Sequence, residues 1–287
     1  MKKYSKIIRH GKNGTHLTIE GNPEVIVMEK LDGANASFGL IEGELKCFSR
    51  NKELNENDGL RGFREWVLKN INADELLPNA IYFGEWLVKH TINYPKDAYH
   101  QFYLFDIYST LYDKYNSFDL VEMESERLNL KLAPVFYKGE FQSLDHVNSF
   151  VGKSAIGEDG EGIVVKNYSY VDKHGNQIFT KIVSDSFAEK KDVKKQKLPS
   201  NANELDNFID TYLTNARVEK MIYKLVDNGV INEDFGIEDT GTILKNSGSL
   251  IVDDILEEEM DSLLKIVKRK ISKKYPNKVR EVITSIQ

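Results

Sequence analysis

Short runs of β-branched and aromatic residues, separated by glycine, asparagine and aspartate, dominate the sequence between residues 25 and 183. Such runs are typical of β-strands joined by tight turns. Two stretches with helical spacing, 63–68 and 120–130, interrupt them, so we expect an α+β fold with antiparallel sheets. The expected strands are 25–28, 36–41, 44–48, 80–85, 102–106, 162–166 and 178–183.

The pattern changes near residue 189. Residues 189–197 form a charged run that is followed by Leu-Pro-Ser-Asn, as expected for a linker. Beyond it, apolar residues recur at helical spacing. We therefore expect a larger domain over residues 1–190, a linker over 191–203 and a small all-helical domain over 204–287.

The composition argues against several kinds of site and location. With one cysteine, Cys47, the chain has no intramolecular disulfide, and a cysteine-based zinc site is not expected. Residues 1–14 lack the apolar core of a signal peptide, and no apolar run has the length of a membrane span. We expect a cytoplasmic protein with no membrane partner. The net charge of -6 argues against a wide non-specific footprint on nucleic acid but allows a local basic groove.

The sequence Lys30-Leu31-Asp32-Gly33 directly follows an expected strand. A lysine at a strand end, before a glycine turn, can direct its amine into a cleft. Nearby cations or burial can lower the pKa of such an amine, so that its neutral form attacks a phosphate. The pattern Lys-x-Asp-Gly arises by chance in roughly one chain in fifteen of this length, so it needs support from elsewhere.

Five further motifs follow the lysine in a fixed order. They are Phe48-Ser49-Arg50-Asn51, Phe83-Gly84-Glu85-Trp86, Leu104-Phe105-Asp106, Glu161-Gly162-Ile163-Val164-Val165-Lys166 and Lys181-Ile182-Val183. In order and spacing, residues 25–190 resemble the covalent nucleotidyltransferase superfamily of DNA ligases, RNA ligases and mRNA capping enzymes. Asn35, the Ser49-Arg50 pair and a helical C-terminal region in place of an OB-fold are similar to the RNA ligase 2 branch.

The resemblance implies an ATP-dependent RNA ligase whose nucleotidyltransferase domain has antiparallel sheets with flanking helices. Lys30 would attack the α-phosphate of ATP, release pyrophosphate and hold AMP as a phosphoamide. AMP would pass to an RNA 5′-phosphate, and a 3′-hydroxyl would then displace it. The implied cofactors are ATP and Mg²⁺ or Mn²⁺, the implied partners are RNA ends in a nicked duplex, the implied process is RNA repair, and a monomer is expected.

The resemblance also implies a role for each motif residue. The catalytic group would be Lys30, Asp32, Glu161 and Lys181. ATP or AMP would be bound by Glu29, Lys30, Asn35, Arg50, Glu85, Phe105, Val164, Lys166 and Lys181. The metal would be held, mostly through water, by Asp32, Glu85, Asp106 and Glu161.

The binding roles that the resemblance implies are consistent with the chemistry of AMP. Phe105 and Val164 would cover the two faces of adenine, although core packing explains these two residues nearly as well. Glu29 would read the base, and Glu85 would bind the ribose hydroxyls or a metal-bound water. The residues that would contact phosphate groups are Asn35, Arg50, Lys166 and Lys181. Among them, Asn35 would meet the incoming phosphate or the 3′ end.

Three alternatives remain open. A DNA ligase or a capping guanylyltransferase would need an OB-fold after the linker, and the helical spacing there argues against it. A catalytically weak nucleic-acid-binding relative is the third alternative. It is favoured by a single departure, because the last motif usually carries two lysines one residue apart and Val183 stands at the second position. Either another cation, such as Lys166 or Lys190, supplies the missing charge, or the first step is slower.

Overall fold

The computed structural model describes residues 2–12, 14–184, 187 and 204–286. The chain divides into two compact units. The first is Met1–Phe187 together with Val226–Glu233, and the second is Ala188–Leu225 together with Asp234–Gln287. The predicted linker over 191–203 lies outside the described residues.

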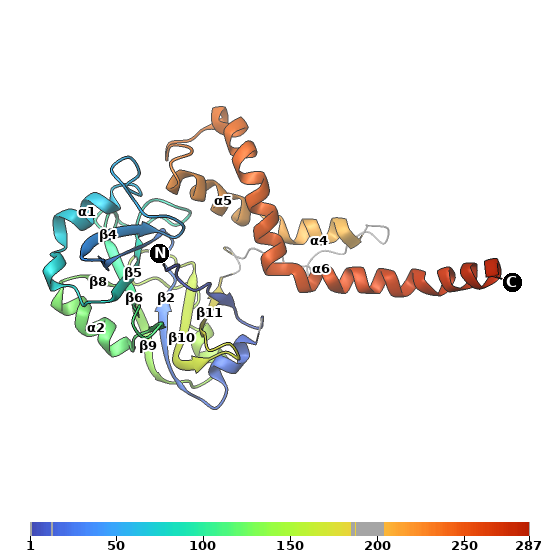
Figure 1. Cartoon of the computed structure of the whole chain (residues 1–287), viewed down its shortest axis with the longest axis horizontal. Helices are drawn as coiled ribbons and strands as arrows, with labels where there is room; N and C mark the ends of the chain where they lie inside the picture. The colour runs from blue at the N-terminus through green and yellow to red at the C-terminus, as the bar shows by residue number, and fades with distance from the viewer. Residues whose placement is uncertain (1, 13, 185–186, 188–203, 287) are drawn as a thin grey trace. The chain divides into compact units, whose positions relative to one another are not determined.

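A six-stranded sheet makes up half of the first unit (Figure 1). Its strands run in the order β4-β3-β5-β6-β7, with β8 paired to β6. All of these pairings are antiparallel except β6 with β8. The strands are β3 (Ala34–Ile41), β4 (Glu44–Ser49), β5 (Ala80–Trp86), β6 (Phe102–Ser109), β7 (Lys114–Tyr115) and β8 (Lys131–Leu132).

A five-stranded sheet makes up the other half, in the order β1-β11-β10-β2-β9. Within this sheet, the described pairings are antiparallel except for the edge pairing of β1 with β11, which is parallel. The strands are β1 (Ile8–Arg9), β2 (Glu24–Glu29), β9 (Val135–Glu140), β10 (Gly162–Val171) and β11 (Gln177–Val183). The expected α+β class with antiparallel sheets is therefore confirmed, and all seven expected strands are present.

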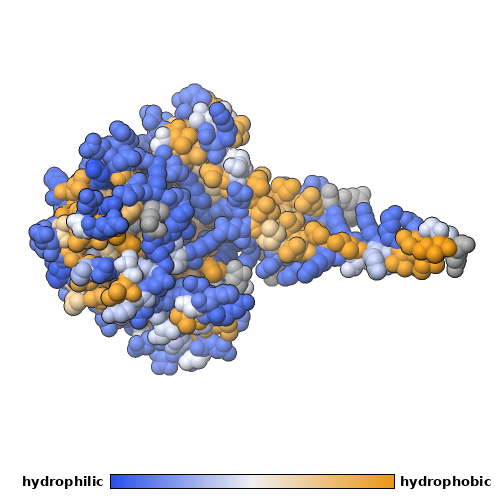
Figure 2. Space-filling view, viewed as in Figure 1, coloured by the Kyte–Doolittle hydropathy of each residue, from blue (hydrophilic) through white to orange (hydrophobic). Residues whose placement is uncertain are grey.

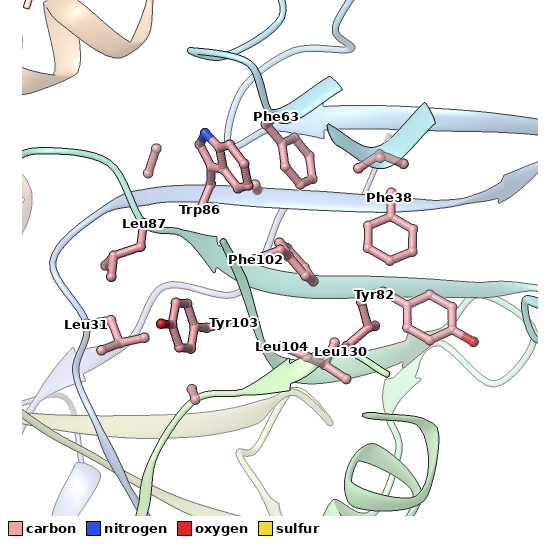
Figure 3. Close-up of a cluster of buried hydrophobic side chains, with 14 of the residues drawn as sticks. Leu31, Phe38, Phe63, Tyr82, Trp86, Leu87, Phe102, Tyr103, Leu104 and Leu130 are labelled. Atoms are coloured by element: carbon pink, nitrogen blue, oxygen red, sulfur yellow. The ribbon is translucent and has the colours of Figure 1, made fainter. Parts of the chain in front are cut away.

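Helices cover the outer face of the six-stranded sheet. Strand side chains alternate between faces, so Phe38, Tyr82 and Phe102 point to one side and pack there against Phe63 of α1 (Phe63–Asn70) (Figure 3). The other elements of this unit are α2 (Phe118–Arg127), α3 (Leu144–Asn148) and the 3-10 helices η1 (Thr15–Ile19) and η2 (Ala73–Glu75). Helix α2 ends before the predicted residue 130, because the left-handed conformation of Asn129 breaks it.

The inner faces of the two sheets meet in a smaller cluster. Val164 and Phe179 of the five-stranded sheet pack there with Ile81 and Phe83 of β5, and Tyr4 fills the space beside them. Side chains that share a face with Val164 therefore look toward the six-stranded sheet. This rule of alternation fixes which motif residues can meet.

The C-terminal residues described are helical, as predicted. They form α4 (Glu204–Tyr212), α5 (Asn215–Asp227), the 3-10 helix η5 (Ile237–Asp239) and α6 (Thr240–Ile286). Arg217 of α5 is fully buried and pairs with Asp254 and with Glu258, 3.2 Å away, on α6. The acidic stretch of α6 thus serves packing within this unit.

Beyond that stretch, α6 keeps several exposed apolar side chains, which gather along its length in Figure 2. They alternate with many lysines and arginines. Among the described residues, none of the helices has the length and apolar character needed to cross a membrane.

Replacing Phe38 by alanine tests the core of the six-stranded sheet. Phe38 is fully buried between Tyr82 and Phe102, so the free energy of unfolding should fall by about 3–5 kcal/mol. Urea unfolding measures this change. As a control, Leu111→Ala removes a side chain that is 68% exposed and should alter stability by no more than about 0.5 kcal/mol. Equal effects of the two substitutions would contradict this packing.

Candidate active site

Lys30 and Glu161 meet because β2 pairs with β10. In this antiparallel pairing Glu29 lies opposite Ile163, and the backbone N–H of Lys30 donates to the carbonyl of Gly162 at 2.9 Å. The register therefore places the residue after β2 beside the residue before β10. There the amine of Lys30 forms an ion pair with the Glu161 carboxylate, and both side chains are largely buried.

The amine of Lys30 is surrounded by negative charge. Burial lowers its pKa, but the Glu161 carboxylate, with smaller contributions from Glu85 and Asp32, outweighs burial and raises the pKa above its ordinary value. Burial acts in the predicted direction, but the groups next to the amine are carboxylates rather than cations, so the net shift of the pKa is upward in this arrangement. Lys30 is an ammonium ion in this arrangement.

Glu85 approaches the same amine from the six-stranded sheet. The pairing of β3 with β5 sets it opposite Asn35, so the two side chains share one face. One Glu85 oxygen accepts a hydrogen bond from the backbone N–H of Gly33 at 3.0 Å. Burial raises the pKa of Glu85 to about 7, and Lys30 and His90 offset only part of that shift.

Asp32 is held by groups that the motifs did not indicate. One of its oxygens accepts from the backbone N–H of Ile92 at 2.8 Å, and the other lies 3.5 Å from Nδ1 of His90. Nε2 of His90 lies 3.2 Å from Asp227. Burial lowers the pKa of His90, but Asp227 and Asp32 together raise it to about 9, so both ring nitrogens carry protons near neutral pH. The closeness of His90 to the Glu85 motif was the one available signal, and nothing in the sequence pointed to Asp227.

Asp106 and Lys166 lie apart from this group. The Asp106 carboxylate is fully buried and accepts from the hydroxyl groups of Tyr4 and Tyr168 and from the amine of Lys166 at 2.7 Å. Lys166 is 2% exposed and also donates to the carbonyl of Phe105 at 2.8 Å. Burial lowers the pKa of Lys166, and Asp106 offsets only part of this effect. These contacts tie the two sheets together. The metal role of Asp106 and the phosphate role of Lys166 stay predictions.

Phe105 lies beside the group formed by Asp106 and Lys166. The pairing of β5 with β6 shifts register here, since Phe83 lies opposite Asp106 while Gly84 lies opposite Leu104. Phe105 is the extra residue of this bulge, and its ring lies 5.1 Å from the amine of Lys166. Bulges reorient side chains, and this one leaves Phe105 partly buried rather than inside the core.

Glu29 uses its carboxylate locally. It accepts hydrogen bonds from the hydroxyl of Ser154 and from the backbone N–H of Ala155 at 2.8 Å. Burial raises its pKa, and these two hydrogen bonds oppose the shift. The side chain therefore fixes the loop that precedes Glu161. The reading of the base by Glu29 stays a prediction.

The predicted phosphate-binding residues lie in several places. Lys181 is buried on β11 opposite Val164, so both share the face that looks toward the six-stranded sheet. Strand β1 places Arg9 directly beside Lys181, a basic residue that the motifs did not indicate. Arg50 is exposed just after β4. Lys190, one of the two cations expected to compensate for Val183, lies outside the described residues.

Among the described residues, no group of three histidine, cysteine, aspartate or glutamate side chains is arranged to bind a metal directly. The carboxylates of Asp32, Glu85 and Glu161 nevertheless act together on one amine. Magnesium usually retains several waters, so carboxylates that do not form a direct binding group could still hold a hydrated ion.

Replacing Glu85 by glutamine should remove a pH dependence of folding stability. Burial raises the pKa of Glu85 from 4.5 to about 7. Its contribution to stability is therefore fully present below pH 4.5 and is lost as the pH rises through about 7. Urea unfolding at about pH 5 and about pH 8 should show the stability of the wild type falling relative to that of Glu85→Gln. A difference that stays constant with pH would contradict the raised pKa.

Comparisons with known proteins identify the family of this chain. A family model described as RNA ligase matches residues 23–183, more than half of the chain. The fold is similar to that of a Naegleria gruberi RNA ligase solved with PPi, and to a mutant of that ligase solved with ATP and Mn. Each is 20% identical to this chain, with a TM-score of 0.50 and coverage of 65% of this chain.

This chain covers 57% of the length of those two solved chains. No curated protein matches the sequence. The family match runs from the residue before β2 to the last residue of β11, and so includes Lys30, Glu85, Glu161 and Lys181. The chain belongs to the RNA ligase family.

Proposed function

We propose that this chain is an ATP-dependent RNA ligase that joins RNA 3′-hydroxyl and 5′-phosphate ends through AMP bound covalently to Lys30. The observation that carries the proposal is the position of the Lys30 amine at the end of β2, where the carboxylates of Glu161, Glu85 and Asp32 act on it in a chain of the RNA ligase family. Two mutants of the Naegleria ligase, one solved with ATP and Mn and the other with AMP and Mn, support the choice of nucleotide and metal.

The proposed first step forms a bond between Nζ of Lys30 and the α-phosphorus of ATP and breaks the bond to pyrophosphate. A proton leaves the amine in this step. Glu161, which pairs with the ammonium, is the nearest base described for it. The AMP then moves to the RNA 5′-phosphate, and the attacking 3′-hydroxyl releases it as the phosphodiester forms.

The carboxylates around Lys30 fit a divalent cation. Burial raises the pKa of Glu85 to about 7, and the nearby Asp32 carboxylate adds a smaller upward contribution that Lys30 and His90 oppose. A hydrated Mg²⁺ or Mn²⁺ held by Asp32, Glu85 and Glu161 would offset the charge of these carboxylates and neutralise ATP phosphates. Asp106 has no part in this proposal, because its oxygens are bonded to Tyr4, Tyr168 and Lys166.

The phosphate groups of ATP and RNA would meet a different set of side chains. Lys181 shares the inner face with Val164, and Arg9 lies beside it on β1, so this edge of the sheet carries two basic residues although Val183 replaces an expected lysine. Arg50 and Asn35 would contact the RNA ends. Phe105 and Val164 would enclose adenine, with Phe105 set by the bulge in β6.

We also propose a division of labour along the chain. Residues 1–190 would carry out nucleotidyl transfer, and the helices within 204–287 would contact RNA. The basic residues of α6 support this assignment, since lysine and arginine side chains neutralise backbone phosphates.

Incubation with ATP and Mg²⁺ should attach one AMP to Lys30. Intact-mass spectrometry would detect the adduct, and peptide mapping would locate it. Lys30→Ala should abolish the adduct because it removes the nucleophile, while exposed Lys173→Ala should leave it unchanged. GTP should give no adduct. Absence of an adduct from the wild type, or its persistence in Lys30→Ala, would overturn the proposed function.

Nicked duplexes test the preference for RNA. Two substrates that differ only in whether the strand bearing the 3′-hydroxyl ends in RNA or DNA should be sealed at different rates, with the RNA end preferred by at least tenfold, or about 1.4 kcal/mol in transition-state energy. Denaturing gels follow the sealing. Equal sealing of the all-DNA nick would instead indicate a DNA ligase.

A further inference from the structure

A short segment that lies about 200 residues after Lys30 in the sequence belongs to the same unit as Lys30. Val226–Glu233 follows the body of α5, yet it groups with Met1–Phe187. Val226 and Ile231 are buried, so the segment is anchored by apolar packing as well as by charge. Its position next to the Asp32 group is therefore a fixed part of this unit.

Two ion pairs attach the segment through Arg61. One guanidinium nitrogen lies 3.4 Å from Asp227 and also donates to the carbonyl of Lys89 at 3.1 Å. The other donates to Glu233 at 2.6 Å. Arg61 is itself fixed, because its carbonyl accepts from the indole N–H of Trp86 at 3.2 Å. Asp227 is thereby held at one end of the His90 ring.

His90 links this segment to Asp32. Its Nε2 lies 3.2 Å from Asp227 and its Nδ1 lies 3.5 Å from Asp32, and the three side chains are only 10–18% exposed. A ring held by carboxylates on both nitrogens cannot rotate without breaking both contacts. The orientation of the Asp32 carboxylate, two residues after Lys30, thus depends in part on a residue near the end of α5.

The other contacts of Asp32 constrain it incompletely. Ile92 N–H binds one oxygen, and the Asp32 backbone N–H donates to the hydroxyl of Tyr94 at 3.1 Å. These contacts fix the backbone and one oxygen. The second oxygen faces His90, so His90 determines the rotation of the carboxylate about its last bond.

We propose that His90 is a positioning residue for Asp32 and that Asp227 acts through His90 to complete the site. This inference rests on the proposed function, since it assigns to His90 the orientation of a carboxylate used in lysyl-AMP formation. The geometry resembles a metal-site arrangement in which a group outside the ligand set orients a ligand. It makes the segment around Asp227 a component of the first chemical step.

Four variants of the full-length chain test the proposal: His90→Ala, His90→Asn, His90→Gln and Asp227→Ala. The rate of lysyl-AMP formation is measured over a range of ATP concentrations at fixed Mg²⁺, and melting temperature reports folding. We expect His90→Ala to lower the maximal rate by about 10- to 100-fold, with a smaller change in the KM for ATP.

The two amide variants separate the two sides of the ring. The amide nitrogen of asparagine can take the place of Nδ1, which faces Asp32, while that of glutamine can take the place of Nε2, which faces Asp227. His90→Asn should therefore recover more of the rate than His90→Gln. His174→Asn, a substitution in an exposed turn, is the matched control and should keep the wild-type rate.

A double variant tests the role of Asp227. If Asp227 acts through His90, adding Asp227→Ala to His90→Ala should lower the rate no further, because interacting residues are not additive. Independent, multiplying effects of the two substitutions on the rate would overturn that part of the proposal.

Two results would overturn the positioning role of His90. One is a wild-type rate in His90→Ala. The other is an equal loss of rate in all three His90 variants that matches their loss of folded protein. If the wild type itself forms no lysyl-AMP, the proposed function fails and this inference fails with it.

Discussion

The register between β2 and β10 determines where chemistry can occur in this chain. It sets Lys30 beside Glu161, although the two residues lie in motifs far apart in the sequence. A shift of one residue would turn the side chains of β2 to the opposite face. Buried contacts at Val25 and Val27 on one face and Ile26 and Met28 on the other prevent such a shift, so core packing fixes the position of the reactive amine.

Charge divides the interior of the first unit into two parts. Near Lys30, several carboxylates act on a single amine. Burial there disfavours the charged form of Glu85 and raises its pKa to about 7. Around Asp106, one carboxylate is matched by Lys166 and two tyrosine hydroxyl groups. The matched group joins the two sheets, and the unmatched group is suited to binding a cation.

Much of the fold followed from local sequence patterns. All the longer strands with repeated apolar residues were predictable, whereas β1 and β7 are too short to produce a pattern and β9 contains polar and glycine residues. Motif order also pointed to Lys30, Glu85 and Glu161 as neighbours. It did not reveal that Lys166 and Asp106 pair with each other. A lysine that follows an apolar run in a strand can be buried or exposed, and the sequence does not distinguish the two.

Long-range contacts account for the rest of what the sequence missed. His90 and Asp227 meet through tertiary packing, and no spacing rule connects residues so far apart. Arg9 lies beside Lys181 only because a two-residue strand pairs at the edge of the sheet. Similarly, the hydrogen bonds that Glu29 makes with Ser154 and Ala155 depend on how one loop folds over the end of β2.

The ion pair between Lys30 and Glu161 has a consequence for the chain at rest. Lysine side chains react with aldehydes, isocyanates and acyl donors only as neutral amines. A lysine whose pKa is raised by carboxylates spends very little time in that form. The contact with Glu161 therefore favours the charged form of Lys30, which these compounds do not attack.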